Sequence, residues 1–116
     1  AQTDAAREAA EQRIIAAERW LPIQRQMIAL RAALAMQRGE HHAAELLYRQ
    51  MIYEYQTQPE TLAAGLIGLA DALIAQGDVD SAGRVLETAI SVLPESPRGY
   101  ERLEAITKAV EMQPTG

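Results

Sequence analysis

Apolar residues recur along this chain at steps of three and four, which is the spacing of one face of an α-helix. A clear run of this spacing is Trp20, Ile23, Met27, Leu30 and Leu34. No segment alternates apolar and polar residues over the length of a strand. The pattern therefore predicts an all-α chain with essentially no sheet.

Glycine and proline divide the chain into helix-length segments. The expected helices are residues 3–20, a second that ends at about Gln37, residues 41–55, a pair that contains Leu62–Leu73 and Ala82–Ile90, and a last helix after Pro97. Short glycine turns separate helices two and three, and helices four and five, so each pair must pack antiparallel. Pro22 either opens the second helix at its first turn or kinks one long helix.

Residues 63–96 carry a pattern of large and small residues around a glycine turn. The pattern consists of Leu66, Leu69, Ala70, Leu73, Gly77-Asp78, Ala82, Leu86, Ala89 and Pro94. It resembles the tetratricopeptide repeat (TPR), which has a period of about 34 residues, although leucine replaces the aromatic residues of that family. The resemblance implies that Ala70, Ala82 and Ala89 lie where helix backbones approach most closely.

The preceding hairpin resembles the repeat less closely. Gly39-Glu40 resembles the turn, and Ala44 and Tyr48 resemble the start of the second helix, but Met51 stands where the family has alanine. The interval from Gly39 to Gly77 is four positions longer than the family period. We therefore expect a divergent repeat with a longer second helix or loop around Tyr55–Pro59.

The resemblance gives the chain an expected organisation. Tyr100 and Leu103 match the opening of a further repeat that stops after one helix, as a capping helix does. The expected parts are an N-terminal helix (1–21) and a TPR-like domain (22–116), with a divergent repeat (about 24–58), a clear repeat (63–96) and a capping helix (97–112). The expected fold is a short TPR-like α-solenoid of stacked antiparallel hairpins.

In the TPR family the first helices of successive repeats line a concave groove. The resemblance implies a partner-binding groove lined by Ala64, Ile67, Asp71, Ile74, Ala75, Arg98, Glu101, Ala105 and Lys108. Chaperone-type repeats hold a peptide carboxylate with Lys and Asn, but Ile67 and Asp71 stand in those places here. We therefore expect a helix or extended segment that lays apolar side chains against Ile67 and Ile74, with the chain's own first helix as the alternative occupant.

The charge distribution disfavours nucleic acid as a partner. The net charge is −5, with seven basic and seven acidic residues in 1–55 but four basic and nine acidic residues in 56–116. A duplex-binding surface needs clustered basic residues, and an acidic membrane surface attracts the same clusters. No apolar run approaches the roughly 20 residues that span a bilayer. We expect a soluble chain without nucleic-acid binding or direct membrane insertion.

The residues that could carry chemistry are few. Without cysteine there is no thiolate ligand or nucleophile, and nothing indicates the cellular compartment. Adjacent helical residues such as His41 and His42 point about 100° apart, and His41 with Glu45 offers too few ligands for a closed metal site. Asp78 and Asp80 lie at a turn, where aspartate commonly bonds the backbone. We expect no catalytic residue, metal or cofactor.

These observations favour a non-enzymatic protein–protein interaction scaffold or adaptor that binds a segment of another protein in the groove. The alternative is an oligomerisation or docking module of a larger assembly, with possible self-association through residues 1–21. In that case exposed Trp20, Tyr53 and Tyr55 would bury against neighbouring chains. Two and a half repeats are close to the minimum for independent stability, which favours such contacts.

Overall fold

The computed structural model describes residues 6–8 and 26–112 of the chain. All the secondary structure in these two ranges is helical, which confirms the all-α part of the prediction. A helical segment at 26–37 is followed by α2 (His41–Glu54), α3 (Pro59–Ala75), α4 (Val79–Val92) and α5 (Pro97–Met112). The first expected helix and Pro22 lie outside the described ranges, except for one helical turn at 6–8.

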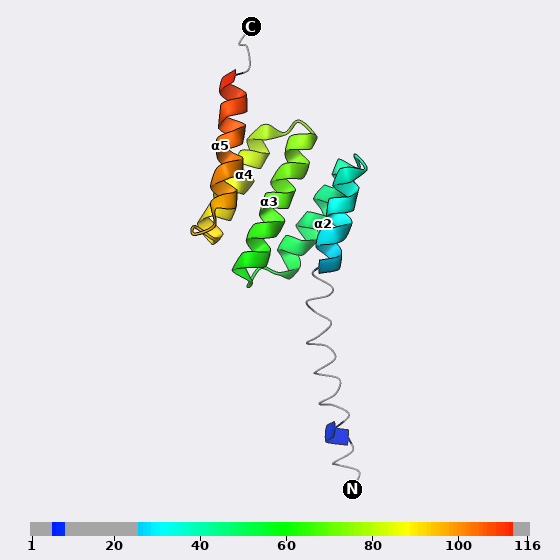
Figure 1. The fold of residues 1–116 in the computed structure, drawn as a ribbon. Helices are drawn as coiled ribbons and strands as arrows, with labels where there is room; N and C mark the ends of the chain where they lie inside the picture. Colours follow the sequence, from blue (N-terminus) through cyan, green and yellow to red (C-terminus); the bar gives the residue numbers. More distant parts are fainter. Residues whose placement is uncertain (1–5, 9–25, 113–116) are drawn as a thin grey trace.

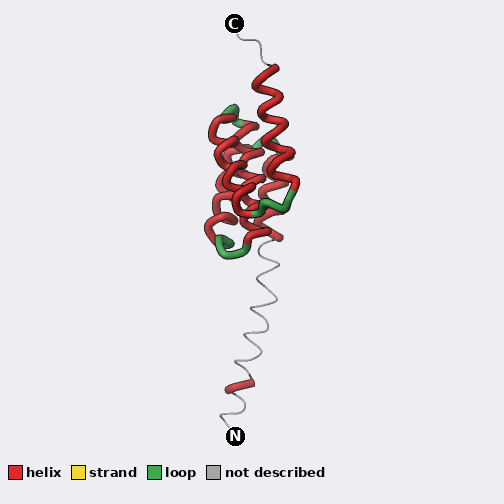
Figure 2. The backbone as a smooth tube through the Cα atoms, turned by 90° about the vertical axis from the view of Figure 1, so that its left-hand side faces the viewer, coloured by secondary structure: helices red, strands yellow, loops and turns green. Residues whose placement is uncertain are grey.

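The helices stand side by side in the order of the sequence (Figures 1 and 2). α3 packs against both α2 and α4, whereas α5 packs mainly against α4. Segment 26–37 packs against α2, where Ile28 contacts Met51 and Tyr55. The described chain is therefore two antiparallel hairpins, 26–54 and 59–92, followed by one helix.

The same backbone turn closes both hairpins. Gly39 and Gly77 have φ values of 76° and 87°, in the left-handed region that glycine adopts most easily. The amide of each glycine donates to the carbonyl three residues earlier (3.1 and 2.9 Å), and the next amide donates to the carbonyl five residues earlier (2.8 and 2.9 Å). These bonds form a Schellman motif, which satisfies the last carbonyls of the helix. Asp78 then caps α4 by accepting a hydrogen bond from the amide of Ser81 (3.3 Å), as expected of an aspartate at this turn.

The two hairpins repeat each other at the interval that separates Gly39 from Gly77, which we name the repeat interval. α2 and α4 each contain 14 residues and begin one repeat interval apart, and a linker of equal length follows each of them. The additional residues beyond the TPR period therefore lie neither in the second helix nor in the linker, where we expected them. They lie in α3. Gly65 faces Ile52 of α2 and is the seventh residue of α3. The equivalent Gly99 faces Ile90 of α4 and is only the third residue of α5. α3 thus begins about one helical turn earlier than the repeat requires.

Small residues fill the closest contacts between the helices. The main apolar cluster consists of Leu66, Ile67, Leu69, Ala70, Leu73, Ala82, Leu86 and Ala89. Ala70 and Ala82 are fully buried, and so are Ala32 and Ala44, which precede them by one repeat interval. The burial of these alanines therefore recurs in the first hairpin at the same interval.

Gly65 and Gly68 allow α2 and α3 to approach closely. A Cβ atom on Gly65 would lie 3.1 Å from the side chain of Ile52, and one on Gly68 would overlap the ring of Tyr48. Tyr48 packs against all three apolar clusters that the described residues form, including the small cluster of Ala35, Ala44 and Ala72. The contact between Gly68 and Tyr48 therefore joins the two hairpins.

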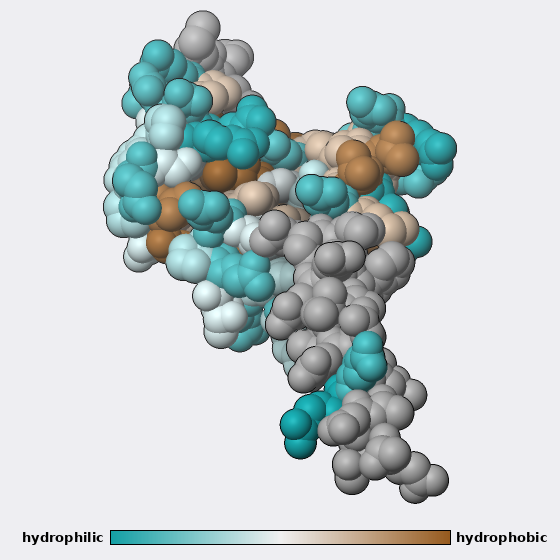
Figure 3. Space-filling model, turned by 60° about the horizontal axis from the view of Figure 1, so that its bottom comes forward, coloured by the Kyte–Doolittle hydropathy of each residue, from teal (hydrophilic) through white to brown (hydrophobic). Residues whose placement is uncertain are grey.

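Segment 26–37 packs through a face other than the one that the sequence emphasises. The residues that it buries are Ile28, Ala32 and Ala35. The larger residues Met27, Leu30 and Leu34 are 41%, 63% and 48% exposed. Figure 3 shows hydrophobic surface on the right, the side on which this segment and α2 lie in Figure 1. The stripe that predicted this helix therefore does not form its core face.

Candidate protein-binding surface

The α3 residues of the predicted groove differ in exposure. Ala75 is exposed, and Ala64, Asp71 and Ile74 are half-buried. Ile67 is only 5% exposed, so the expectation that it offers its side chain to a partner is wrong. Ile67 belongs to the main apolar cluster, against which residues of α2, α4 and α5 pack. Ile74 packs against the same cluster, so it is only partly available.

A charged contact links α3 to α5 beside these residues. Arg102 of α5 forms an ion pair with Asp71, with its Nη2 atom 3.3 Å from the Oδ2 atom of the carboxylate. Burial raises the pKa of the Asp71 carboxyl, while the positive charges of Arg102 and Arg98 act in the opposite direction. Burial and the charge of Asp71 together raise the pKa of the Tyr48 hydroxyl. The structure therefore brings two predicted groove residues, Asp71 and Arg98, within electrostatic reach of each other, together with Arg102, which sequence reasoning missed.

The remaining predicted residues of α5 lie on its exposed surface. Arg98, Glu101, Ala105 and Lys108 are all exposed. Lys108 forms its ion pair with Glu104 on its own helix, at 3.1 Å, and the charges of such an exposed pair remain accessible to a partner. The surface between α3 and α5 thus has half-buried apolar positions with charged side chains at its edge.

Ala64 belongs to a different part of the surface. It lines an open cavity of about 270 Å³ between segment 26–37 and α3. The other residues that line this cavity are Gln26, Ala29, Met51, Glu60 and Thr61. The predicted groove residues therefore do not all border one cavity.

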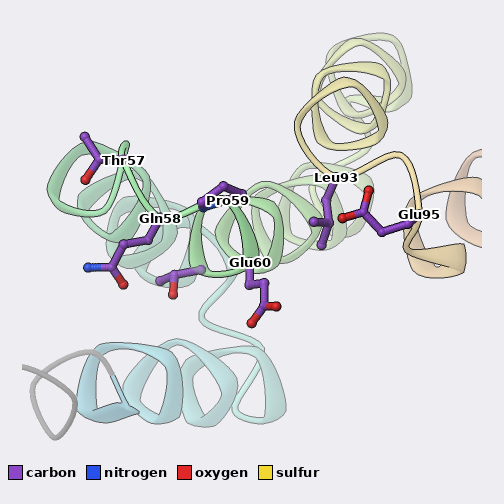
Figure 4. Close-up of a pocket in the computed structure, with 7 residues that line it drawn as sticks. Thr57, Gln58, Pro59, Glu60, Leu93 and Glu95 are labelled. Atoms are coloured by element: carbon purple, nitrogen blue, oxygen red, sulfur yellow. The ribbon is translucent and has the colours of Figure 1, made fainter.

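A larger pocket of about 420 Å³ lies between the linker that follows α2 and the linker that follows α4 (Figure 4). Its lining residues are Thr57, Gln58, Pro59, Glu60, Thr61, Leu93 and Glu95. The additional first turn of α3 forms one wall of this pocket. Figure 4 shows the carboxylates of Glu60 and Glu95 pointing in different directions, so they do not converge as an acid–base pair would. Sequence reasoning missed this pocket. The residue that could have indicated it is Pro59, because a proline one helical turn before the repeat at 63–96 predicts an earlier start of the helix.

The histidines form no ligand cluster with neighbouring carboxylates. Glu45 lies 3.8 Å from His42 rather than pairing with His41. It also accepts hydrogen bonds from Gln76 and Arg49, both at 2.9 Å, and these bonds lower the pKa of its carboxyl. Within 6–8 and 26–112, no three His, Cys, Asp or Glu side chains gather as metal ligands do.

The aromatic residues expected on a docking surface divide into two groups. Tyr53 is 77% exposed, in agreement with that expectation. Tyr55 is buried, which contradicts it, because its side chain belongs to the apolar cluster of Ile28 and Met51. Trp20 lies outside the described residues.

Comparison with protein-family models, curated proteins and solved structures found no match to this chain. Among the described helices, none combines the length and the apolar character needed to cross a membrane.

Proposed function

We propose that this chain is a non-enzymatic protein–protein interaction scaffold of TPR-like repeats, which binds a segment of a partner protein along α3 and α5. The repeated hairpin supports a TPR-like origin: both turns use a left-handed glycine, and fully buried alanines recur at the repeat interval. Such repeats stack into extended surfaces that hold partner segments.

The observation that carries the proposal is the surface between α3 and α5. Ile74 and Ala75 offer apolar area there, while Asp71 and Arg102 form an ion pair that is only partly buried. An apolar strip with charges at its edge suits a partner helix or extended segment whose apolar side chains face the strip. Because Ile67 is buried, the proposed apolar contact is narrower than the sequence implied and centres on Ile74 and Ala75.

The test uses a substitution that blocks the strip without entering the core. The partner is captured on the unaltered chain and identified, and its binding isotherm is then measured against Ala75→Arg and Ala43→Arg. Both alanines are exposed on helices, so both variants should keep the melting temperature of the parent. Ala75→Arg should weaken binding by at least about tenfold, whereas Ala43→Arg on α2 should leave it unchanged. Equal binding by both variants would move the functional surface away from α3.

The alternative proposal is an oligomerisation or docking module, for which the exposed Leu46 and Tyr53 of α2 are the supporting observation. Sedimentation of the full chain separates the two functions, because a self-associating module changes its mass with concentration and a monomeric scaffold does not.

A further inference from the structure

A second surface, at the N-terminal end of the stack, has the properties of a docking site. Met27, Leu30 and Leu34 form one exposed stripe on segment 26–37, which we name the N-terminal stripe. Successive residues of a helix are about 100° apart, so this stripe points away from the buried face of Ile28 and Ala32. Three neighbouring large apolar side chains at this exposure favour an interaction surface.

The repeat shows what kind of element covers this face. One repeat interval after Met27, Leu30 and Leu34, the chain has Gly65, Gly68 and Ala72 of α3. On α3 this face is covered by α2, through Ile52, Tyr48 and Ala44. On α5 the corresponding close contact is made by α4, where Ile90 meets Gly99. The neighbour at this face is a helix on α3 and at Gly99 of α5, so the element that fits the N-terminal stripe is also a helix.

The sizes of the side chains determine how such a helix would pack. Glycine and alanine on α3 allow the larger side chains of α2 to fit against its backbone. On segment 26–37 large side chains occupy the equivalent positions, so a helix with the surface of α2 would clash with them. A complementary helix has small residues such as alanine at its contact positions, between which Met27, Leu30 and Leu34 insert.

The charges beside the stripe favour an acidic partner. Residues 26–38 contain Arg31 and Arg38 and no acidic residue, whereas residues 39–112 contain five basic and twelve acidic residues. Both arginines are exposed, and their spacing of seven places them on one edge of the helix beside the stripe. A second copy docked symmetrically would bring like charges together. The chain's own helical turn at Ala6–Glu8 is exposed and lies apart from the packed helices in Figure 1, so it does not cover the stripe.

We propose that the N-terminal stripe binds an amphipathic helix of another protein, with small apolar residues on its contact face and acidic residues along one edge. The acidic edge pairs with Arg31 and Arg38, and the apolar face covers Met27, Leu30 and Leu34. This site is separate from the proposed strip on α3 and α5, and it does not depend on that function.

The test uses two synthetic helical peptides of about 16 residues with the same alanine-rich contact face. One carries glutamate along one edge, and the other carries lysine at the same positions. Fluorescence anisotropy measures the binding of each labelled peptide to the full chain at low salt. The glutamate peptide should bind at least about tenfold tighter than the lysine peptide, and added salt should reduce this preference. The double variant Arg31→Glu/Arg38→Glu should reverse the preference.

A matched pair of variants locates the contact. Leu30→Gln should weaken binding of the glutamate peptide by at least about tenfold, whereas Val110→Gln, at an exposed apolar residue on the other end of the stack, should not. Ala75→Arg should also leave peptide binding unchanged, which separates this site from the proposed function.

Three outcomes would overturn the proposal. The first is a binding result that contradicts the site: neither peptide binds, both bind equally, or Leu30→Gln has no effect on binding. The second is a dimer in sedimentation equilibrium that Leu30→Gln dissociates, which would make a second copy the occupant. The third is a melting temperature lowered by Leu30→Gln but not by Val110→Gln, together with peptide binding that appears only after residues 1–21 are removed. That result would make the chain's own N-terminal segment the occupant.

Discussion

The two ends of the stack differ in whether a neighbouring helix packs on the equivalent helical face. At the C-terminal end, α5 covers the second hairpin, and its Gly99 approaches Ile90 of α4 closely. At the N-terminal end, Leu30 of segment 26–37 is 63% exposed. It lies one repeat interval before Gly68, which α2 covers on α3. A repeat can therefore keep its turns and its buried alanines while it changes what its outer faces can bind, because the contact residues vary independently of the core.

The largest expected effect comes from making the same truncation in the core and on the N-terminal stripe. Leu86 is fully buried, so Leu86→Ala should lower the free energy of unfolding by about 2–5 kcal/mol through lost burial and a residual cavity. Leu30→Ala should change it by no more than about 0.5 kcal/mol because the side chain is exposed. Urea denaturation of both variants measures the difference. A large loss for Leu30→Ala would show that the stripe is already covered.

Next in size is the contact that joins the hairpins. Gly68→Ala should destabilise the chain by about 1–3 kcal/mol, because the added methyl group displaces the ring of Tyr48. Gly83→Ala is the matched control, since no atom lies within 4 Å of its added Cβ. That control should gain about 0.5–1 kcal/mol from helix propensity. Thermal melts that place both variants on the same side of the parent would contradict this packing.

The two turns should respond alike. Gly39→Ala and Gly77→Ala each force a side chain into a left-handed conformation with open space around it, at a cost of about 1–2 kcal/mol. Equal shifts in the urea midpoint would sharpen the comparison by showing that the hairpins share their turns and differ in their outer faces. A much smaller shift for Gly39→Ala would indicate that the first hairpin contributes little to cooperative unfolding.

The smallest expected effect depends on pH. Because the pKa of Asp71 is raised above its ordinary value of 3.8, the folded chain binds this proton more tightly than the unfolded chain does. The stabilising contribution of the protonated group is complete below pH 3.8 and is lost as the pH rises through the folded-state pKa. Asp71→Asn should therefore raise the free energy of unfolding at pH 7. The gain should be less than about 1 kcal/mol, because the loss of the ion pair with Arg102 offsets part of it, and it should vanish below pH 3.8. Melting curves from pH 3 to pH 7 measure this, and a variant less stable than the parent at pH 7 would show that the ion pair outweighs burial.

Much of the local structure could be predicted from the sequence, and part of the proposed site could not. The helix at 41–55 and the glycine turns follow from three-and-four spacing and from left-handed glycine, which are properties of the chain itself. The burial of Ile67 depends on how several helices pack into one cluster, and no local pattern encodes that packing. The ion pair between Asp71 and Arg102 joins two helices that are not consecutive in the sequence, so only the packing of these helices reveals it.

By itself the sequence determined the all-helical class, the two hairpins and the small residues at the closest contacts, because these depend on spacing and on side-chain volume. It also contained two apolar faces on segment 26–37, one of Ile28, Ala32 and Ala35 and one of Met27, Leu30 and Leu34. Only the tertiary structure decided which of them is buried. The physical reason is that backbones approach closely where alanine is available, so the hairpin packs on the face with the smaller side chains and leaves the larger ones exposed.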